Sequence, residues 1–179
     1  DYATPGVDPF SPDNPLIFTS APLVGTGLTT TAKFAVVTKS PLTGFIADSL
    51  SSSYFAIELK RTGVDSLVIT GQAASLAYIH IRNEIVEIRD AGYLMGKTAS
   101  ETESLIRTEL SSAATRVAAI GKAGENRVRF ATISNEGRHA GRGGVGAVMG
   151  SKNLKAIALW GDRETEVANR NGVEAIVKS

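Results

Sequence analysis

Cysteine is absent from the 179 residues of this chain, and only two histidines, His80 and His139, occur in it. The lack of thiols excludes disulfides, thiolate metal sites and a cysteine nucleophile within this stretch. Two imidazoles far apart in sequence are too few for a zinc site built inside the chain. His80 has no carboxylate pair or second histidine placed with it, which is typical of a partly solvated strand side chain rather than of a catalytic base.

An excess of charge and long apolar runs are missing as well. Lys and Arg together number 19 against 18 Asp and Glu, so no global basic field would attract nucleic acid or an anionic membrane. No apolar run approaches the roughly 20 residues that cross a bilayer, and no basic region followed by an apolar one opens the chain. We therefore expect a soluble, cytoplasmic protein whose anion sites, if any, are local.

The two ends of the chain suggest its domain organisation. Four of the six prolines fall within residues 1–15, which predicts an extended connector. The chain begins at Asp1 without a methionine, as a piece of a longer chain would. From Arg163 onward it is polar with a weak helical pattern. These features predict one domain over residues 1–161, followed by a linker or the start of a further domain at 162–179.

Between these ends, periodicity predicts an α+β domain with short helices. Alternating or β-branched runs predict strands over residues 16–21, 33–39, 44–47, 65–70, 76–81, 84–88, 116–120, 127–134 and 154–160. Hydroxyls at 51–53 cap a helix over 54–61, and a capping box that begins at Thr98 or Ser100 starts another. Residues 121–126 are expected to form a turn, and 145–150 a short helix.

Two pairs of segments resemble each other in the same order. Residues 33–37 stand beside 129–133, and 66–71 beside 156–161, at nearly the same offset. A duplicated unit would make this an internally duplicated, pseudo-two-fold β-sheet domain that binds something with two similar halves. The alternative is that strands of similar composition align by accident.

A glycine-rich stretch from Gly137 to Gly150 surrounds Arg138, His139 and Arg142. This is too much backbone freedom for an ordinary helix, and the cations suggest an anion. Part of the stretch satisfies GxGxxG, but the glycines come late in the chain and follow a hairpin, unlike a Rossmann unit; a Walker A order is not met. Phosphate bound by backbone N–H groups at a helix N-terminus remains, and the alternative is a turn that only allows close packing.

Three blocks of sequence resemble the N-terminal domain of the tungsten-containing aldehyde ferredoxin oxidoreductase family. They are GRGGVGAVMGSKNLKAIA at 141–158, VTKSPLTGF at 37–45 and GKAGEN at 121–126, and the resemblance runs from Val7 to Gly161. It implies a pseudo-two-fold β-sheet domain, the base on which two pyranopterin dithiolenes (tungstopterin) hold tungsten, with Mg²⁺ bridging the cofactor phosphates. A 4Fe–4S cluster would be bound by a C-terminal part outside this chain.

The resemblance also implies roles for particular residues. Arg138 matches an arginine between a pterin and the cluster, and Lys33 falls where members often have a cofactor-contacting arginine. His139 and Leu50 match positions whose backbone carbonyls approach the magnesium. Together with the glycine pattern, this predicts a cofactor-binding set of Lys33, Leu50, Arg138, His139, Ala140, Gly141, Arg142, Gly143, Gly144 and Gly146.

The function that the resemblance implies is oxidation of aldehydes to carboxylic acids by a tungsten or molybdenum bis-pterin enzyme, with ferredoxin as electron acceptor. The metal would carry the chemistry while this domain orients the cofactor. Expected partners are the remaining domains of the same enzyme, ferredoxin and a second copy in a homodimer. The alternatives are a family relative that reduces aromatic thioesters and a stand-alone pterin-binding or interaction module. The isolated chain is expected to be inactive.

Overall fold

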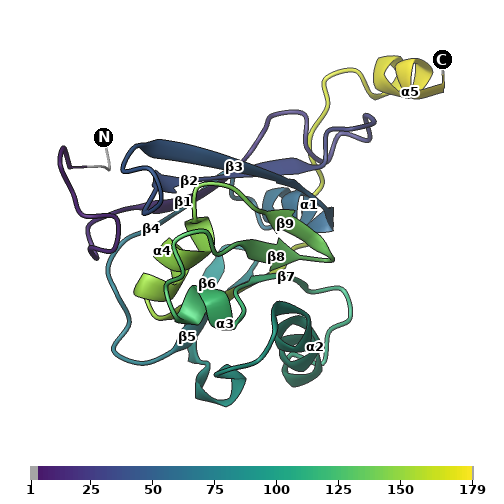
Figure 1. The fold of residues 1–179 in the computed structure, drawn as a ribbon. Coiled ribbons are helices and arrows are strands. Elements are labelled where there is room, and N and C mark those ends of the chain that lie inside the picture. The colour runs from purple at the N-terminus through teal and green to yellow at the C-terminus, as the bar shows by residue number, and fades with distance from the viewer. Residues whose placement is uncertain (1–3, 179) are drawn as a thin grey trace.

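Two β-sheets form the body of the chain, described by a computed structural model over residues 4–178 (Figure 1). The smaller sheet is antiparallel and has the order β3-β2-β1-β4. Its strands are β1 (Leu16–Ser20), β2 (Lys33–Lys39), β3 (Ile46–Ser52) and β4 (Ser66–Ile69). The edge strand β3 is therefore paired on one side only within this sheet.

The larger sheet has six strands in the order β6-β5-β10-β7-β8-β9. They are β5 (Ala77–Arg82), β6 (Ile85–Asp90), β7 (Arg116–Ala119), β8 (Ile133–Asn135), β9 (Arg138–Ala140) and β10 (Leu154–Trp160). Strands β5 and β10 run parallel, whereas the other neighbouring pairs are antiparallel. At the far edge, β8 and β9 form a tight hairpin in which Asn135 lies opposite Arg138.

The helices are short, and their ends follow the capping residues. They are α1 (Tyr54–Arg61), the 3-10 helix η1 (Gly92–Leu94), α2 (Ala99–Glu109), α3 (Lys122–Glu125), α4 (Val145–Ser151) and α5 (Arg170–Lys178). Ser53 caps α1 by accepting a hydrogen bond from the Phe55 N–H. The capping box of α2 begins at Thr98, with Glu101 completing it, so the option at Ser100 is not used. None of these helices, in residues 4–178, is long and apolar enough to span a membrane.

The main core lies between the two sheets, where α1 and α4 are sandwiched (Figure 1). The rings of Phe18, Phe34 and Phe55 meet there, with centroids 4.9 Å apart for the closest pair, Phe34 and Phe55. A second, smaller core fills the space between α2 and the other face of the larger sheet, around Tyr78 and Ile106. Alternation along β10 supplies both cores, because successive side chains of a strand point to opposite faces.

The predicted mixed fold of sheets and short helices is confirmed, but one predicted strand is wrong. Of residues 127–134, only the last two enter β8. Residues 129–132 instead turn main-chain carbonyls toward the glycine-rich segment, where Ala131 accepts a hydrogen bond from the Gly146 N–H at 3.0 Å. The expected turn at 121–126 contains α3, and the strand expected at 44–47 begins at Ile46 and runs on to Ser52.

The internal duplication is not confirmed. Residues 33–37 lie in β2, but their proposed counterparts at 129–133 are largely outside any strand. Strand β4 lies at the edge of its sheet. Strand β10, its proposed counterpart in the repeat, lies in the interior of the other sheet. Similar composition therefore does not give these segments similar places in the fold.

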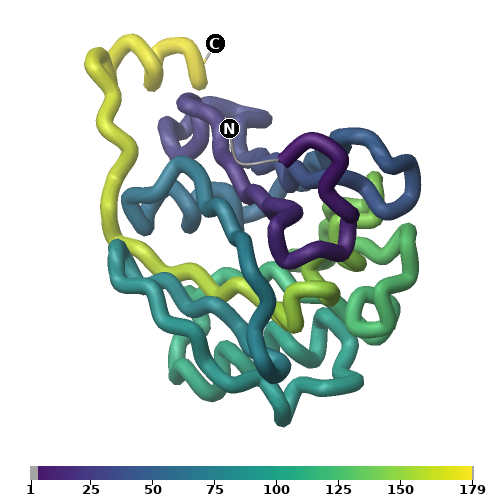
Figure 2. The backbone as a smooth tube through the Cα atoms, turned by 90° about the vertical axis from the view of Figure 1, so that its left-hand side faces the viewer, coloured from purple at the N-terminus to yellow at the C-terminus, as the bar shows by residue number. Residues whose placement is uncertain are grey.

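The last residues leave the body after β10. Figure 2 shows the segment from about residue 162 rising along the molecule to α5, which stands apart from the sheets. The segment is tied to the body by the Arg163 N–H, which donates to the Arg61 carbonyl at 3.1 Å, and by the Thr165 hydroxyl, which donates to the Val24 carbonyl at 3.2 Å. A domain boundary after residue 161 remains a prediction.

Candidate functional site at the meeting of the two sheets

The predicted residues gather where the edge strand β3 of the small sheet lies beside β9 of the large one; we call this junction the seam. Side chains, rather than a main-chain ladder, provide the hydrogen bonds that the structure shows across it. The Ser49 hydroxyl accepts from the Arg142 N–H at 2.9 Å, and the Asn135 amide donates to the Ser51 hydroxyl at 3.1 Å. Because Ser51 and Asn135 are buried, this second bond fixes the two sheets against each other.

A first hollow of about 580 Å³ opens on one side of the seam. Its lining comes from both sheets and includes Leu50, His139, Gly141 and Arg142 of the predicted set, together with Asp48. Leu50 is 62% exposed and lies on the outer side of β3. The His139 ring is oriented by its Nδ1, which lies 2.8 Å from the Ser134 hydroxyl.

A second hollow of about 570 Å³ lies beside the first and contains Arg138. Its other lining residues are Ala32, Ser52, Ser53, Tyr54, Ile57, Arg116 and Glu136. Lys33 is the β2 partner of Ser52, so its Cα lies one strand away from this hollow. The structure thus brings Lys33 and Arg138, far apart in sequence, to the same end of the seam.

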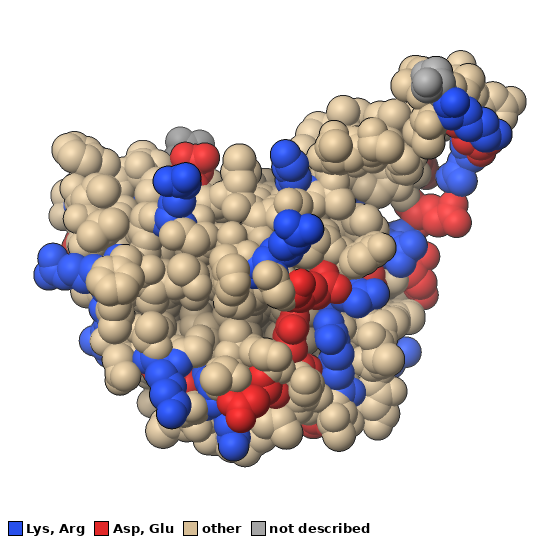
Figure 3. Space-filling view, turned by 45° about the vertical axis from the view of Figure 1, so that its right-hand side comes forward, with Lys and Arg blue, Asp and Glu red and all other residues tan. Residues whose placement is uncertain are grey.

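Three cations of the seam carry no ion pair within residues 4–178: Lys33, Arg138 and Arg142 are all exposed, and no carboxylate lies within ion-pair distance of them. Arg116 differs, because its Nη1 is 2.8 Å from the Glu136 carboxylate. In the view of Figure 3, basic and acidic side chains are interspersed over the surface, so the molecule does not show a broad field of one sign there. The seam offers local, unneutralised positive charge, which suits an anionic ligand.

The glycine-rich segment divides into an exposed part and a packed part. A Cβ at Gly144 would lie 1.9 Å from the Arg129 carbonyl oxygen, and one at Gly146 would lie 2.4 Å from the Thr132 carbonyl oxygen. Gly143 and Gly144 also adopt the left-handed region, at φ 66° and 68°. The close-packing interpretation therefore describes these positions, while Gly141 remains exposed in the first hollow.

The N-terminus of α4 is not presented to solvent. Its seven residues are all buried, and Gly144, which precedes them, is buried too. Ala140 is also fully buried, between the exposed His139 and Gly141. The exposed donors near the glycines are thus side chains of β9 and the loop after it, not the end of the short helix.

Sequence reasoning missed the residues that come from elsewhere in the chain. Arg116 was assigned only to a strand, yet β7 carries it to the second hollow, where its guanidinium lies 5.1 Å from the centroid of the Tyr54 ring. Glu136 was not singled out. The signal that could have revealed it is the Glu136–Gly137 pair between two strands, a two-residue turn with positive φ at both positions.

The donor set fits a phosphate-bearing group rather than a metal held directly by side chains. No group of three or more His, Asp or Glu residues in the described part of the chain could hold a metal ion. Guanidinium and ammonium groups are the usual partners of phosphate oxygens. A metal at the seam would therefore need ligands supplied by the anion itself or by main-chain carbonyls.

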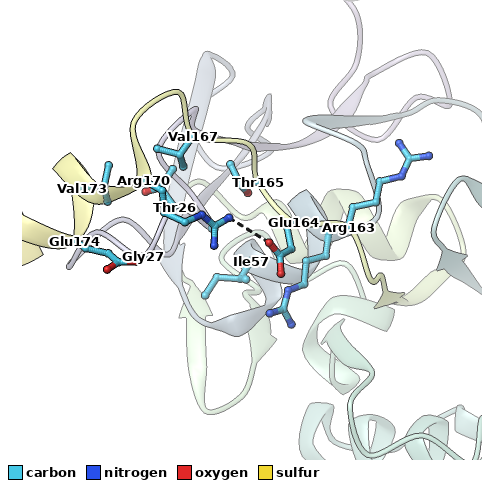
Figure 4. Close-up of a pocket in the computed structure, with 12 residues that line it drawn as sticks. Thr26, Gly27, Ile57, Arg163, Glu164, Thr165, Val167, Arg170, Val173 and Glu174 are labelled. Atoms are coloured by element: carbon cyan, nitrogen blue, oxygen red, sulfur yellow. Dashed lines mark hydrogen bonds and ion pairs between the residues drawn. The ribbon is translucent and has the colours of Figure 1, made fainter.

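A separate pocket lies between the Gly25–Gly27 loop, α1 and the C-terminal segment, and has a volume of about 330 Å³ (Figure 4). It contains no residue of the predicted set. Its charges largely compensate one another: Arg170 pairs with Glu164 at 3.1 Å, and Arg163 pairs with Glu84 at 3.0 Å. We therefore regard the seam as the candidate site.

Comparison with known proteins identifies the family of the chain. The family model for the N-terminal domain of aldehyde ferredoxin oxidoreductase matches residues 1–161. The tungsten-containing aldehyde ferredoxin oxidoreductase of Pyrococcus furiosus is 52% identical over 175 residues, which cover 97% of this chain and 29% of the relative. The protein of the same name from Thermococcus kodakarensis is 50% identical over the same shares. The chain thus spans less than a third of the length of these curated relatives.

Relatives with other substrates are also similar. The WOR-like subunit of an aliphatic sulfonate oxidoreductase from Pyrococcus furiosus is 39% identical over 87% of this chain and 27% of the relative. Among solved structures, the active site complex BamBC of benzoyl coenzyme A reductase with 1,5-dienoyl-CoA matches with a TM-score of 0.97 and 44% identity, over 99% of this chain and 27% of that one. The fold is therefore shared by relatives whose names describe different reactions.

Proposed function

This chain belongs to the aldehyde ferredoxin oxidoreductase family through its N-terminal domain, and we propose that it is the cofactor-binding domain of a tungsten or molybdenum bis-pterin oxidoreductase. The observation that carries the proposal is the 52% identity to a tungsten-containing relative over 97% of the chain. The seam supports it independently, because Lys33, Arg138 and Arg142 lie there without a carboxylate partner among residues 4–178.

In this proposal, the exposed cations of the seam bind and orient the cofactor. Lys33, Arg138 and Arg142 would hold its anionic groups, with Gly141 allowing close approach beside Arg142. The backbone carbonyls of Leu50 and His139 would hold a Mg²⁺ ion, which would neutralise part of the charge of the cofactor. When bound, the cofactor supplies the metal-centred redox chemistry. Ala140, Gly143, Gly144 and Gly146 contribute by fixing the shape of the chain behind the exposed residues.

The complete reaction and its partners belong to the whole protein. We propose that the full-length enzyme oxidises aldehydes to carboxylic acids in the cytoplasm, and passes electrons through a 4Fe–4S cluster, bound outside this chain, to ferredoxin. The remaining domains of the enzyme would pack against this one, and a second copy would complete a homodimer.

A second candidate is a reductase of aromatic thioesters, which is favoured by the 0.97 TM-score and 44% identity to the benzoyl coenzyme A reductase complex. The seam does not separate the two reactions, because it would hold the same class of cofactor in both. We give aldehyde oxidation precedence because the identity to aldehyde oxidoreductases is higher.

The test uses the full-length protein purified from cells grown with tungstate. We expect tungsten and magnesium by elemental analysis, pterin fluorescence after acid release, and reduction of ferredoxin when a panel of aliphatic and aromatic aldehydes is added. Oxidation of 1,5-dienoyl-CoA without aldehyde activity would favour the second candidate. Protein that contains no tungsten, molybdenum or pterin would contradict both and favour a binding or interaction module.

A further inference from the structure

Glu136, in the turn before β9, bonds to three elements next to the seam through its side chain and its own amide. Its Oε2 accepts a hydrogen bond from the Phe55 N–H at 3.2 Å, in the first turn of α1, and its Oε1 accepts from Arg116 Nη1 on β7 at 2.8 Å. Its backbone N–H donates to the Glu103 carboxylate on α2 at 2.8 Å. Both carboxylate oxygens of Glu136 are thus used inside the protein.

The position of Glu136 in the chain makes these bonds significant. It is the first residue of the two-residue turn between β8 and β9, and the turn leads directly into Arg138 and His139. Its φ of 48° lies in the left-handed region, which a residue with a Cβ adopts less readily than glycine. The bonds of the carboxylate compensate for this backbone cost.

The same carboxylate shapes the second hollow. It neutralises Arg116, whose guanidinium lies against the exposed ring of Tyr54 in the wall of that hollow. It also shares the Phe55 N–H at the start of α1 with the Ser53 hydroxyl, which accepts from the same N–H at 3.0 Å. Of the two arginines that line this hollow, Arg138 is therefore the one without an ion pair in the described part of the chain.

We propose that Glu136 is a positioning residue for the cofactor site. It fixes the β8–β9 turn against α1 and β7, so that Arg138 and His139 face β3 at a constant distance, and it directs the anion to Arg138 by neutralising Arg116. The inference rests on the proposed function for the identity of the ligand, but the positioning itself is a property of the chain.

The test compares Glu136→Gln, Glu136→Asp and Glu136→Gly in the full-length protein. Amide exchange without cofactor measures the positioning: we expect exchange at Phe55 and residues 138–140 to be about tenfold faster in Glu136→Gly, because the local opening loses two bonds. Glu136→Gln, which keeps one acceptor, is expected to be intermediate. Ser111→Gly is the matched control, since Ser111 also has a positive φ, of 50°, and its side chain is exposed away from the seam.

The second measurement is tungsten and pterin content after gel filtration, with the electron paramagnetic resonance spectrum of the loaded fraction. We expect Glu136→Gln to retain about tenfold less cofactor, with an altered spectrum, at nearly unchanged thermal stability, and Glu136→Asp to restore part of the content. Unchanged exchange in Glu136→Gly would overturn the proposal. So would faster exchange with wild-type cofactor content and spectrum, since the role would then be structural only. A wild-type protein without cofactor contradicts the proposed function, while exchange still decides the positioning role.

Discussion

The seam differs in the pairing of its charged side chains from a second polar region, the network of hydrogen bonds and ion pairs beneath α2. In the network, Glu109 accepts hydrogen bonds from Tyr78, at 2.7 Å, and from Tyr93, and lies 3.4 Å from Arg89. Arg89 in turn binds Glu87, at 2.7 Å. Each of these charges has a protein partner, whereas three cations of the seam have none within residues 4–178.

The pKa shifts in the network come from burial and from hydrogen bonds between its own members. Burial, together with the hydrogen bond to Glu109, raises the pKa of Tyr78 to about 12. Burial alone would raise the pKa of Glu109, but the bonds from Tyr93, Tyr78 and Arg89 outweigh it and the pKa is lowered. A set of groups that stabilise one another in this way has no need of a ligand. The contrast teaches that the candidate site differs from the network in the pairing of its cations, not in the presence of charge as such.

The largest expected effect comes from adding a side chain at a buried glycine of the glycine-rich segment. Gly150→Ala places a Cβ 1.9 Å from the Gly124 carbonyl oxygen, at a helical position where alanine is otherwise favoured. We expect a loss of about 3 kcal/mol or more in the free energy of unfolding, at the upper end of overpacking effects. Urea denaturation of the chain measures it. Gly141→Ala is the control, because its nearest neighbour would be 3.8 Å away, and a comparable loss there would refute the division of the segment.

Removing an unpaired cation is expected to affect ligand binding and leave stability almost unchanged. Arg138→Ala and Arg142→Ala should each reduce tungsten and pterin retention in the full-length protein by about tenfold, as the loss of a charged hydrogen bond would. Arg89→Ala provides the contrast: its partners are left without their cation, so stability falls by about 1 kcal/mol while cofactor content is kept. If Arg89→Ala lost the cofactor as strongly, the distinction between the two regions would fail.

A smaller effect is expected from the buried bond across the seam. Ser51→Ala leaves the fully buried Asn135 amide without the hydroxyl that it contacts, which should cost about 1–2 kcal/mol in the free energy of unfolding. Ser49→Ala removes the acceptor of the Arg142 N–H. Ser49 is buried, but Arg142 is exposed, so water can replace the acceptor at this N–H, and the change should cost about 0.5 kcal/mol. Thermal denaturation separates the two. Equal losses of stability in the two variants would show that water replaces neither hydrogen-bond partner.

The smallest effect is the acid sensitivity of the paired network. Because the pKa of Glu109 lies below its ordinary value of 4.5 in the folded protein, its contribution to stability is fully present above that value and is lost as pH falls through the lowered pKa. Melting temperatures measured from pH 6 down to pH 3 should therefore fall less steeply for Glu109→Gln than for the wild type. Arg138→Ala should keep the wild-type slope, and a flattened slope in that variant would place an acid-sensitive pair at the seam.

Local patterns predicted most of the secondary structure, for reasons visible in single segments. The capping boxes near Thr98 and the serine cap before α1 act within one turn of chain, and the alternation along β2 reflects which of its faces is buried. The strand predicted over 127–134 failed because the carbonyls of residues 129–132 approach glycines some fifteen residues further on, a contact that no local pattern records. The apparent repeat failed for a similar reason, since composition does not specify the neighbours of a strand.

Within the site, the sequence by itself determined the residue types: cations flanked by glycines at 137–146, and a resemblance that the comparisons confirmed over nearly the whole chain. Only the tertiary structure decided which of these residues can meet a ligand. It packs Gly144 and Gly146 against main chain, leaves Arg138 and Arg142 without an ion pair among the residues that the structure describes, and brings in Arg116 from another strand and Glu136 from the preceding turn. The physical reason is that burial and pairing depend on what lies across the seam, and β3 and β9 meet only when the two sheets pack together.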